Sequence, residues 1–135
     1  MPAALEGGCL CGAVRYRLHD TPRERSDCHC VDCRRASAAP FVTWGSFRRD
    51  QVEIVSGDVR KVSHADRLRS FAGCCGTPLF FEEHDSCEWM DVTVASLDQP
   101  EAYSPDVAIW IEDRLPWVLL DPSRQTYDQG RESLA

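Results

Sequence analysis

The segment Cys28-His29-Cys30-Val31-Asp32-Cys33 places three thiols within six residues. Its Cys30-x-x-Cys33 half has the spacing of a zinc knuckle, in which the backbone turns direct both sulfurs at one ion. A Cys-x-x-Cys pair is also typical of thioredoxin-like redox sites, but those belong to a βαβ unit and need no third cysteine at Cys28. The segment therefore predicts a metal site with three cysteine ligands.

A second group of cysteines comes from two distant segments. Cys9-Leu10-Cys11 precedes Gly12, and Cys74-Cys75 precedes Gly76. Four thiolates on one ion form a closed structural site, whereas three leave zinc a fourth position for water or substrate. The ligand role of Cys74 stays open, because adjacent residues direct both sulfurs at one ion only with backbone distortion, and Cys87 or a histidine is the alternative. We expect one to two zinc ions per chain.

The alternative use of eight cysteines is four disulfides, as in small secreted proteins. Three features favour metal binding instead. The first residues show no signal peptide, and 135 residues with 43% hydrophobic side chains suffice for a core without staples. The cysteines also lie in close pairs, whereas disulfides stabilise most by closing long loops. We therefore expect a cytoplasmic protein in which residues 1–135 form a single domain with no membrane span.

Short strand patterns recur along the chain and predict a mainly β fold. Residues 14–18 alternate apolar and polar side chains at period two. The other expected strands are 52–55, 68–71, 79–81, 90–94, 107–111 and 117–120. The stretch 34–39 is the one expected helix, and Pro40 should end it within about two turns. The polar tail 125–135 should be loosely ordered.

Several motifs occur in the order found in one known family. They are Gly8-Cys9-Leu10-Cys11-Gly12-Ala13-Val14-x-Tyr16, Cys28-His29-Cys30-x-x-Cys33-Arg34, Phe71-x-x-x-Cys75-Gly76-Thr77-Pro78-Leu79, Val92-x-Val94-x-x-Leu97-Asp98 and Ile109-Trp110-x-x-x-x-Leu115-Pro116-Trp117. From Gly7 to about Asp121, the chain resembles the glutathione-dependent formaldehyde-activating enzyme family, which also contains the centromere protein V type zinc domain. The resemblance implies a tent-like, zinc-binding β fold with one short helix after Cys33.

The resemblance also implies site residues and a reaction. It places a structural zinc on Cys9, Cys11 and the Cys75 region, and a second zinc with an open position on Cys28, Cys30 and Cys33. The implied activity is that of a carbon-sulfur lyase similar to S-(hydroxymethyl)glutathione synthase, which adds glutathione to formaldehyde. A non-catalytic zinc-binding interaction module is the alternative, and so is a related reaction on another thiol adduct.

Two positions depart from the family pattern. Ala72 stands where the family usually carries a cysteine, so the four-sulfur site needs Cys74 or another ligand. Ala38 stands where relatives often carry glycine after the Cys-Arg segment, and glycine there would permit close approach of a ligand to the backbone.

Ligand charge favours thiol chemistry over hydrolysis. Three thiolates leave a zinc complex at a formal charge of about −1, which acidifies water less than three neutral imidazoles do. A thiol at the fourth position would still bind as thiolate and remain nucleophilic toward an aldehyde. Arg34 and Arg35 follow the cluster directly and are candidates for binding the carboxylates of glutathione, although a surface salt bridge is the alternative.

The remaining expectations concern charge, histidines and aromatic residues. A formal net charge of −7 argues against nucleic acid as a partner. His29 should point away from the metal, and nothing places His64 or His84 near it. Phe41 and Trp44 are expected to wall a pocket, whereas Trp110 and Trp117 are expected in the core.

Overall fold

The computed structural model describes residues 5–131 as a mainly β protein with one α-helix. The strands are β1 (Leu5–Gly8), β2 (Arg15–Leu18), β3 (Arg25–Cys28), β4 (Val42–Arg48), β5 (Val52–Ser56), β6 (Val59–His64), β7 (Arg67–Ala72), β8 (Pro78–Glu82), β9 (Trp89–Thr93), β10 (Val107–Ile109) and β11 (Gln125–Thr126). The helix is α1 (Val31–Ser37), and the 3-10 turns are η1 (Arg49–Gln51), η2 (Val94–Ser96), η3 (Pro100–Ala102) and η4 (Ile111–Asp113). None of the helices within the described range could cross a membrane.

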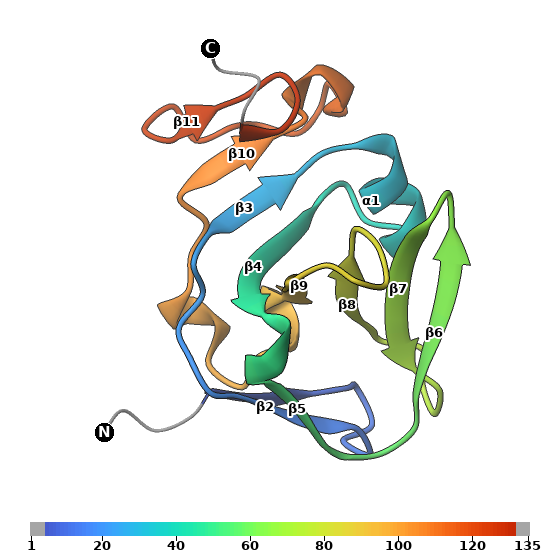
Figure 1. The fold of residues 1–135 in the computed structure, drawn as a ribbon. Coiled ribbons are helices and arrows are strands. Elements are labelled where there is room, and N and C mark those ends of the chain that lie inside the picture. Colours follow the sequence, from blue (N-terminus) through green and yellow to red (C-terminus); the bar gives the residue numbers. More distant parts are fainter. Residues whose placement is uncertain (1–4, 132–135) are drawn as a thin grey trace.

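The strands form two sheets. The larger has the order β11-β10-β3-β4-β9-β8-β7-β6, and the smaller has the order β1-β2-β5. Neighbouring strands are antiparallel, except that β10 is parallel to both β3 and β11. In Figure 1 the larger sheet curves from β11 across β4 to β6, with the smaller sheet below it. These features confirm the expected mainly β fold.

The core lies where the two sheets meet. Tyr16 and Leu18 of β2 have no exposed surface, and they pack with buried side chains of β4, β8 and β9. The ring of Tyr16 meets that of Phe80 edge-on, with the centroids 5.3 Å apart. Arg15 and Arg17 point the other way and pair with acidic side chains. The period-two pattern therefore predicted β2 correctly, because one face of this strand is buried and the other is not.

Residues 117–120 do not form the expected strand. The Val118 amide donates to the Leu115 carbonyl at 3.0 Å, and the Arg114 guanidinium donates to the Val118 carbonyl at 2.6 Å, so the segment folds as a turn. Trp117 is consequently 67% exposed, and its expected place in the core was wrong. Trp110 does pack against a buried cluster, the one that contains Trp44.

The segment from residue 125 to residue 131 is held by the sheet rather than loosely ordered. Strand β11 pairs with β10, and the Trp110 amide donates to the Gln129 carbonyl at 2.8 Å. Arg131 adds an ion pair to Asp106 at 2.8 Å. These backbone pairings are invisible in the polar composition of the tail. The rest of the expected tail, 132–135, lies outside the described residues.

Helix α1 begins earlier than the sequence predicted because a cysteine caps it. The Cys30 sulfur accepts a hydrogen bond from the Cys33 amide at 3.2 Å. This cap allows the helix to begin at Val31 rather than at Arg34. The helix ends at Ala38, which adopts a left-handed conformation with φ 55° and ψ 35°, two residues before Pro40. Glycine takes this conformation without strain, which gives a physical reason for the glycine that relatives often carry here.

Candidate metal centres

The four-sulfur cluster comprises Cys9, Cys11, Cys74 and Cys75, whose sulfurs all lie within 4.8 Å of one another. Cys9 lies 3.7 Å from both Cys11 and Cys74, the Cys11–Cys74 distance is 3.3 Å, and the Cys74–Cys75 distance is 3.9 Å. Tetrahedral zinc with Zn–S bonds of about 2.3 Å requires sulfurs about 3.8 Å apart. The cluster therefore fits one zinc-sized ion with four ligands.

Two glycine turns build this cluster. Gly12 and Gly76 each follow a cysteine pair directly and have φ values of +83° and +85°, which side-chain-bearing residues rarely adopt. The Val14 amide then donates to the Cys9 sulfur at 3.2 Å. Thr77 joins the two segments, since its hydroxyl accepts the Leu10 amide at 3.0 Å.

Cys74 supplies the sulfur that the family usually has at position 72. Ala72 is fully buried at the end of β7, and its amide donates to the Thr77 carbonyl at 2.9 Å. Its carbonyl accepts the Gly76 amide at 2.7 Å. This tight turn carries Cys74 and Cys75 together to the sulfurs of the N-terminal pair. The structure thus brings together all four cysteines named for this site.

The three-sulfur cluster comprises Cys28, Cys30 and Cys33, whose sulfurs also lie within 4.8 Å of one another. Cys28 ends β3, Cys30 caps α1 and Cys33 lies in its first turn. Cys28 and Cys33 are 5% and 6% exposed. Within residues 5–131, no further histidine, cysteine or carboxylate belongs to this group. The cluster can hold a metal ion and leave one coordination position for another ligand.

The Cys30 sulfur carries the negative charge of this cluster most readily. The thiols of Cys28 and then Cys33 donate hydrogen bonds to it and lower the pKa of Cys30 to about 2, with the Arg69 guanidinium contributing further. The sulfurs of Cys30 and Cys33, together with burial, raise the pKa of Cys28. The hydrogen bonds and the nearby cation therefore favour one thiolate in this cluster, at Cys30.

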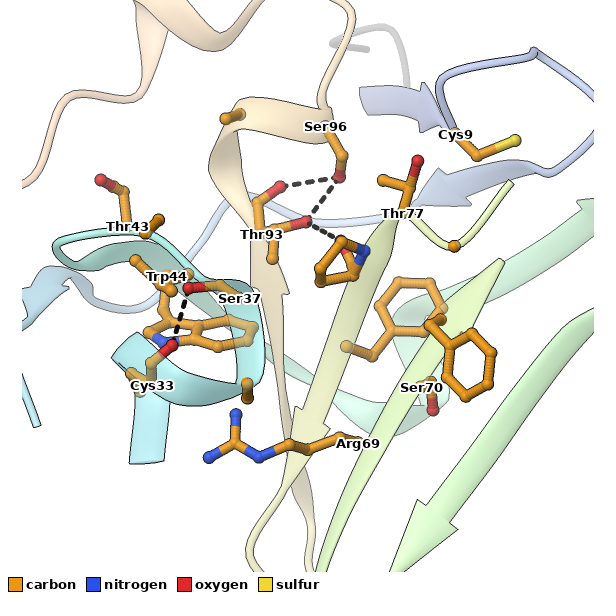
Figure 2. A pocket seen from close by; sticks show the side chains of 18 of the residues that line it. Cys9, Cys33, Ser37, Thr43, Trp44, Arg69, Ser70, Thr77, Thr93 and Ser96 are labelled. Carbon is orange, nitrogen blue, oxygen red and sulfur yellow. Dashed lines mark hydrogen bonds between the residues drawn. The ribbon is translucent and has the colours of Figure 1, made fainter. Parts of the chain in front are cut away.

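An apolar cavity of about 740 Å³ adjoins the three-sulfur cluster at Cys33. Its walls are mainly aromatic and aliphatic, and include Phe41, Trp44, Val62, Phe71, Pro78 and Phe80. Figure 2 looks into this cavity, with Cys33 and Trp44 on one side and Cys9 on the other. The two aromatic residues expected to wall a pocket, Phe41 and Trp44, both line it.

A second cavity, of about 710 Å³, is lined by all three cysteines of the cluster. We call it the charged cavity, because its ionisable residues are Asp32, Arg67, Arg69, Glu83, Asp91 and Asp113. The Arg69 guanidinium lies over the Phe81 ring, 4.7 Å from its centroid. Burial raises the pKa of Asp91 to about 7, although a hydrogen bond to Ser46 opposes the shift.

The arginines beside these cavities are not the ones that sequence proximity suggested. Arg34 and Arg35 line a separate hollow with Leu115 and Trp117, and neither borders the two cavities. Arg67 and Arg69 of β7 border the charged cavity instead. Strand β7 borders the same cavity as α1 although the two are distant in the sequence, so spacing alone did not find these arginines.

The histidines lie outside both sulfur clusters. His29 is 1% exposed, and its ring packs against Phe41 with the centroids 4.9 Å apart. Burial lowers the pKa of His29. His64 and His84 are exposed, at the end of β6 and in the loop after β8.

The fold and these clusters define a small β protein with two groups of cysteines that could each hold a metal ion. Residues 4–113 match the model of the glutathione-dependent formaldehyde-activating enzyme family, and the chain belongs to this family. It is 30% identical over 76 residues to an uncharacterized lyase of Schizosaccharomyces pombe, and the match spans 56% of each of the two chains. A crystal structure of a Rhodobacter sphaeroides protein has the same fold, with a TM-score of 0.59 at 20% identity over 74% of this chain and 96% of that one.

Proposed function

We propose that the protein is a zinc-dependent, carbon-sulfur lyase-type enzyme that adds glutathione to formaldehyde and gives S-hydroxymethylglutathione. The observation that carries the proposal is a difference in ligand number and surroundings: the four-sulfur cluster can fill all four positions of one ion, whereas the other cluster offers three sulfurs, all of which line the charged cavity. Family membership and the lyase name of the yeast relative support the reaction class.

Cys28, Cys30 and Cys33 would hold the ion. Zinc held there would have one coordination position left for a thiol and would favour its nucleophilic thiolate form. Trp44, which is 7% exposed, packs on this cluster and keeps bulk water from one side of it. A low local dielectric strengthens the attraction between the sulfurs and nearby cations.

The charged cavity suits a zwitterionic thiol. Glutathione carries two carboxylates and one ammonium group, and this cavity offers Arg67 and Arg69 for the former and several carboxylates for the latter. Arg69 is half-buried and makes no ion pair with a carboxylate within residues 5–131. A partly desolvated guanidinium without a carboxylate partner favours a ligand carboxylate. Arg34 and Arg35 remain the alternative contacts, through the neighbouring hollow.

The addition needs no redox partner. The thiolate sulfur forms a bond to the formaldehyde carbon, the carbonyl π electrons move to the oxygen, and the proton released by the thiol ends on that oxygen. The reverse direction cleaves the same carbon-sulfur bond.

The test combines calorimetry with exchange spectroscopy of the hemithioacetal on zinc-loaded protein. Glutathione should bind more tightly as pH rises toward the thiol pKa, because the thiol loses its proton on binding. Cys30→Ser should abolish both binding and accelerated exchange. Arg69→Gln should weaken glutathione binding about tenfold, whereas Arg35→Gln should not.

Three outcomes would separate the parts of the proposal. Glutathione binding without faster exchange than in buffer would remove the catalytic step and leave a thiol-binding protein. Absence of binding would favour the interaction module or another ligand. Weaker binding in Arg35→Gln and not in Arg69→Gln would move the carboxylate contact back to α1.

A further inference from the structure

The two cavities beside the three-sulfur cluster meet at the same residues but differ in chemistry. Cys33, Trp44 and Arg69 line both of them. The charged cavity has six ionisable side chains besides its cysteines, whereas Arg69 is the one charged side chain among the described residues that line the apolar cavity. A single ligand bound across this junction would therefore have one charged half and one apolar half.

We propose that the apolar cavity binds the aldehyde-derived group of the thiol adduct, and that the preferred aldehyde carries an aliphatic or aromatic chain. The glutathione part then occupies the charged cavity, with its sulfur at the three-sulfur cluster between the two. This inference rests on the proposed function, since it takes a glutathione sulfur to bind at that cluster.

The apolar cavity is much larger than a formaldehyde molecule. Formaldehyde is little larger than water, which occupies about 30 Å³ in the liquid, whereas this cavity measures about 740 Å³. Cavities of roughly 300–1,000 Å³ hold ligands with many non-hydrogen atoms. Phe41, Trp44, Phe71 and Phe80 supply aromatic surface suited to apolar chains and rings.

Two hydroxyl groups of this cavity already have hydrogen-bond partners within the protein. The Thr93 hydroxyl donates to the Pro78 carbonyl at 3.0 Å and lies 2.8 Å from the Ser96 hydroxyl (Figure 2). The Ser96 hydroxyl also shares a hydrogen bond with the Tyr16 hydroxyl at 2.6 Å. None of the buried polar side-chain atoms that lack a partner in the described part of the chain lines this cavity. An apolar chain beside Thr93 and Ser96 therefore leaves neither hydroxyl without a hydrogen-bond partner.

The reaction with such an aldehyde balances in the same way as with formaldehyde. The sulfur of glutathione bonds to the aldehyde carbon, the carbonyl π bond breaks toward oxygen, and the thiol proton ends on the new hydroxyl. The chain of the aldehyde takes no part in bond making. It contributes binding energy next to the reacting atoms.

The first test compares stable S-substituted glutathiones on zinc-loaded protein by calorimetry. S-hexylglutathione has five more methylenes than S-methylglutathione, and each contributes about fourfold in affinity when fully buried. Burial of only half of them would make the hexyl conjugate bind about 30-fold more tightly, which is the smallest difference that we expect. Its heat-capacity change on binding should also be more negative, which is the signature of apolar burial. Exchange spectroscopy should show a larger acceleration over buffer for hexanal with glutathione than for formaldehyde.

A matched pair of variants localises the effect. Val62 lines the apolar cavity and is 51% exposed, whereas Val55 on β5 is 46% exposed and lines neither cavity. Val62→Asp should reduce the hexyl-to-methyl affinity ratio to less than about fivefold, and Val55→Asp should leave it as in the parent protein. Phe71→Ala removes apolar surface from the same cavity without adding a charge, and it should also lower the hexyl-to-methyl affinity ratio.

The outcomes distinguish this inference from the proposed function. If glutathione binds and formaldehyde exchange is accelerated, but the hexyl conjugate binds no more tightly than the methyl one, the inference is overturned and the proposed function stands. A hexyl preference that Val55→Asp lowers as much as Val62→Asp would also overturn it. No binding of glutathione or of either conjugate would overturn both together.

Discussion

Substituting a cysteine of the four-sulfur cluster should destabilise the zinc-loaded protein more than substituting one of the three-sulfur cluster. Cys11 and Cys74 are 63 positions apart in the sequence, so an ion that joins them closes a long loop. Cys28 and Cys33 are five positions apart, and an ion there closes a short one. A cross-link restricts the unfolded chain more when the loop is longer.

The chain-entropy relation for cross-links gives the size of the difference. A loop of about 64 residues corresponds to roughly 4 kcal/mol at 25 °C, and a loop of about six residues to roughly 2 kcal/mol. We therefore expect Cys74→Ser to lower the free energy of unfolding by about 2 kcal/mol more than Cys30→Ser. For a domain of this size, the difference corresponds to a gap of about 8 °C in Tm.

Urea unfolding of zinc-loaded protein measures this difference. Cys30 is the suitable comparison because it is partly exposed, so its substitution leaves no large cavity. Cys87→Ser is the control, since Cys87 belongs to neither cluster and a serine hydroxyl can keep its bond to the Trp89 carbonyl. With a chelator present, Cys74→Ser should cost less than about 0.5 kcal/mol, because its side chain is exposed.

Equal losses of stability for Cys74→Ser and Cys30→Ser with zinc bound would refute the loop-closure reasoning. A large loss for Cys74→Ser that persists in chelator would refute it as well, since the effect would then not depend on metal. An equal loss of stability in Cys87→Ser and Cys74→Ser would indicate that lost side-chain packing, and not lost metal binding, causes the effect.

Four further predictions follow. Elemental analysis should find between one and two zinc ions per chain with free thiols, and disulfides without zinc would contradict both clusters. The pKa of Asp91 is raised to about 7, so the folded state holds an extra proton between about pH 4 and 7 and the parent protein loses stability as pH rises through this range. Asn does not titrate, so urea titrations should show Asp91→Asn gaining about 2 kcal/mol of stability relative to the parent between pH 5 and pH 8. Ala38→Gly should raise stability by about 1 kcal/mol because φ is positive there, whereas Ala39→Gly should lower it. Duplex DNA should not bind at micromolar protein in about 0.15 M salt, because a net charge of −7 opposes the phosphates.

Sequence periodicity predicted β2, one face of which meets the core, but it missed β4, although Phe47 of β4 is buried in that core. It also missed strands whose pairing is carried by the backbone. Strand β3 reads Arg25-Ser26-Asp27-Cys28 and has no apolar alternation, yet it lies between β4 and β10. Strands β1 and β6 were missed for related reasons, since glycines fill half of β1 and β6 is mostly exposed. Residues 117–120 are mostly apolar and were wrongly predicted to form a strand, because that segment pairs with no strand of the described sheets.

The cysteine ligands could be predicted because metal sites leave their signature in local spacing. All seven cysteines named for the two sites fall into the two clusters, including Cys74. The arginines beside the open cluster could not be found in this way, since Arg69 lies near Cys30 only in the folded chain and is 39 positions away in the sequence. One signal was present. Arg67 and Arg69 alternate at period two in a strand that ends at the Phe71 motif, which places both on one face.

Strand β7 connects the two clusters. Arg69 and Phe71 line the cavities, and the same strand runs directly into the turn that carries Cys74 and Cys75. Its pairing with β8 shifts register between Ser70 and Phe71, within the same continuous strand. A metal on the four-sulfur cluster would fix the end of β7 to the N-terminal segment and thereby help to hold Arg69 beside the three-sulfur cluster. The four-sulfur site would then contribute to ligand binding by setting the position of one strand, without contacting the ligand's charged half.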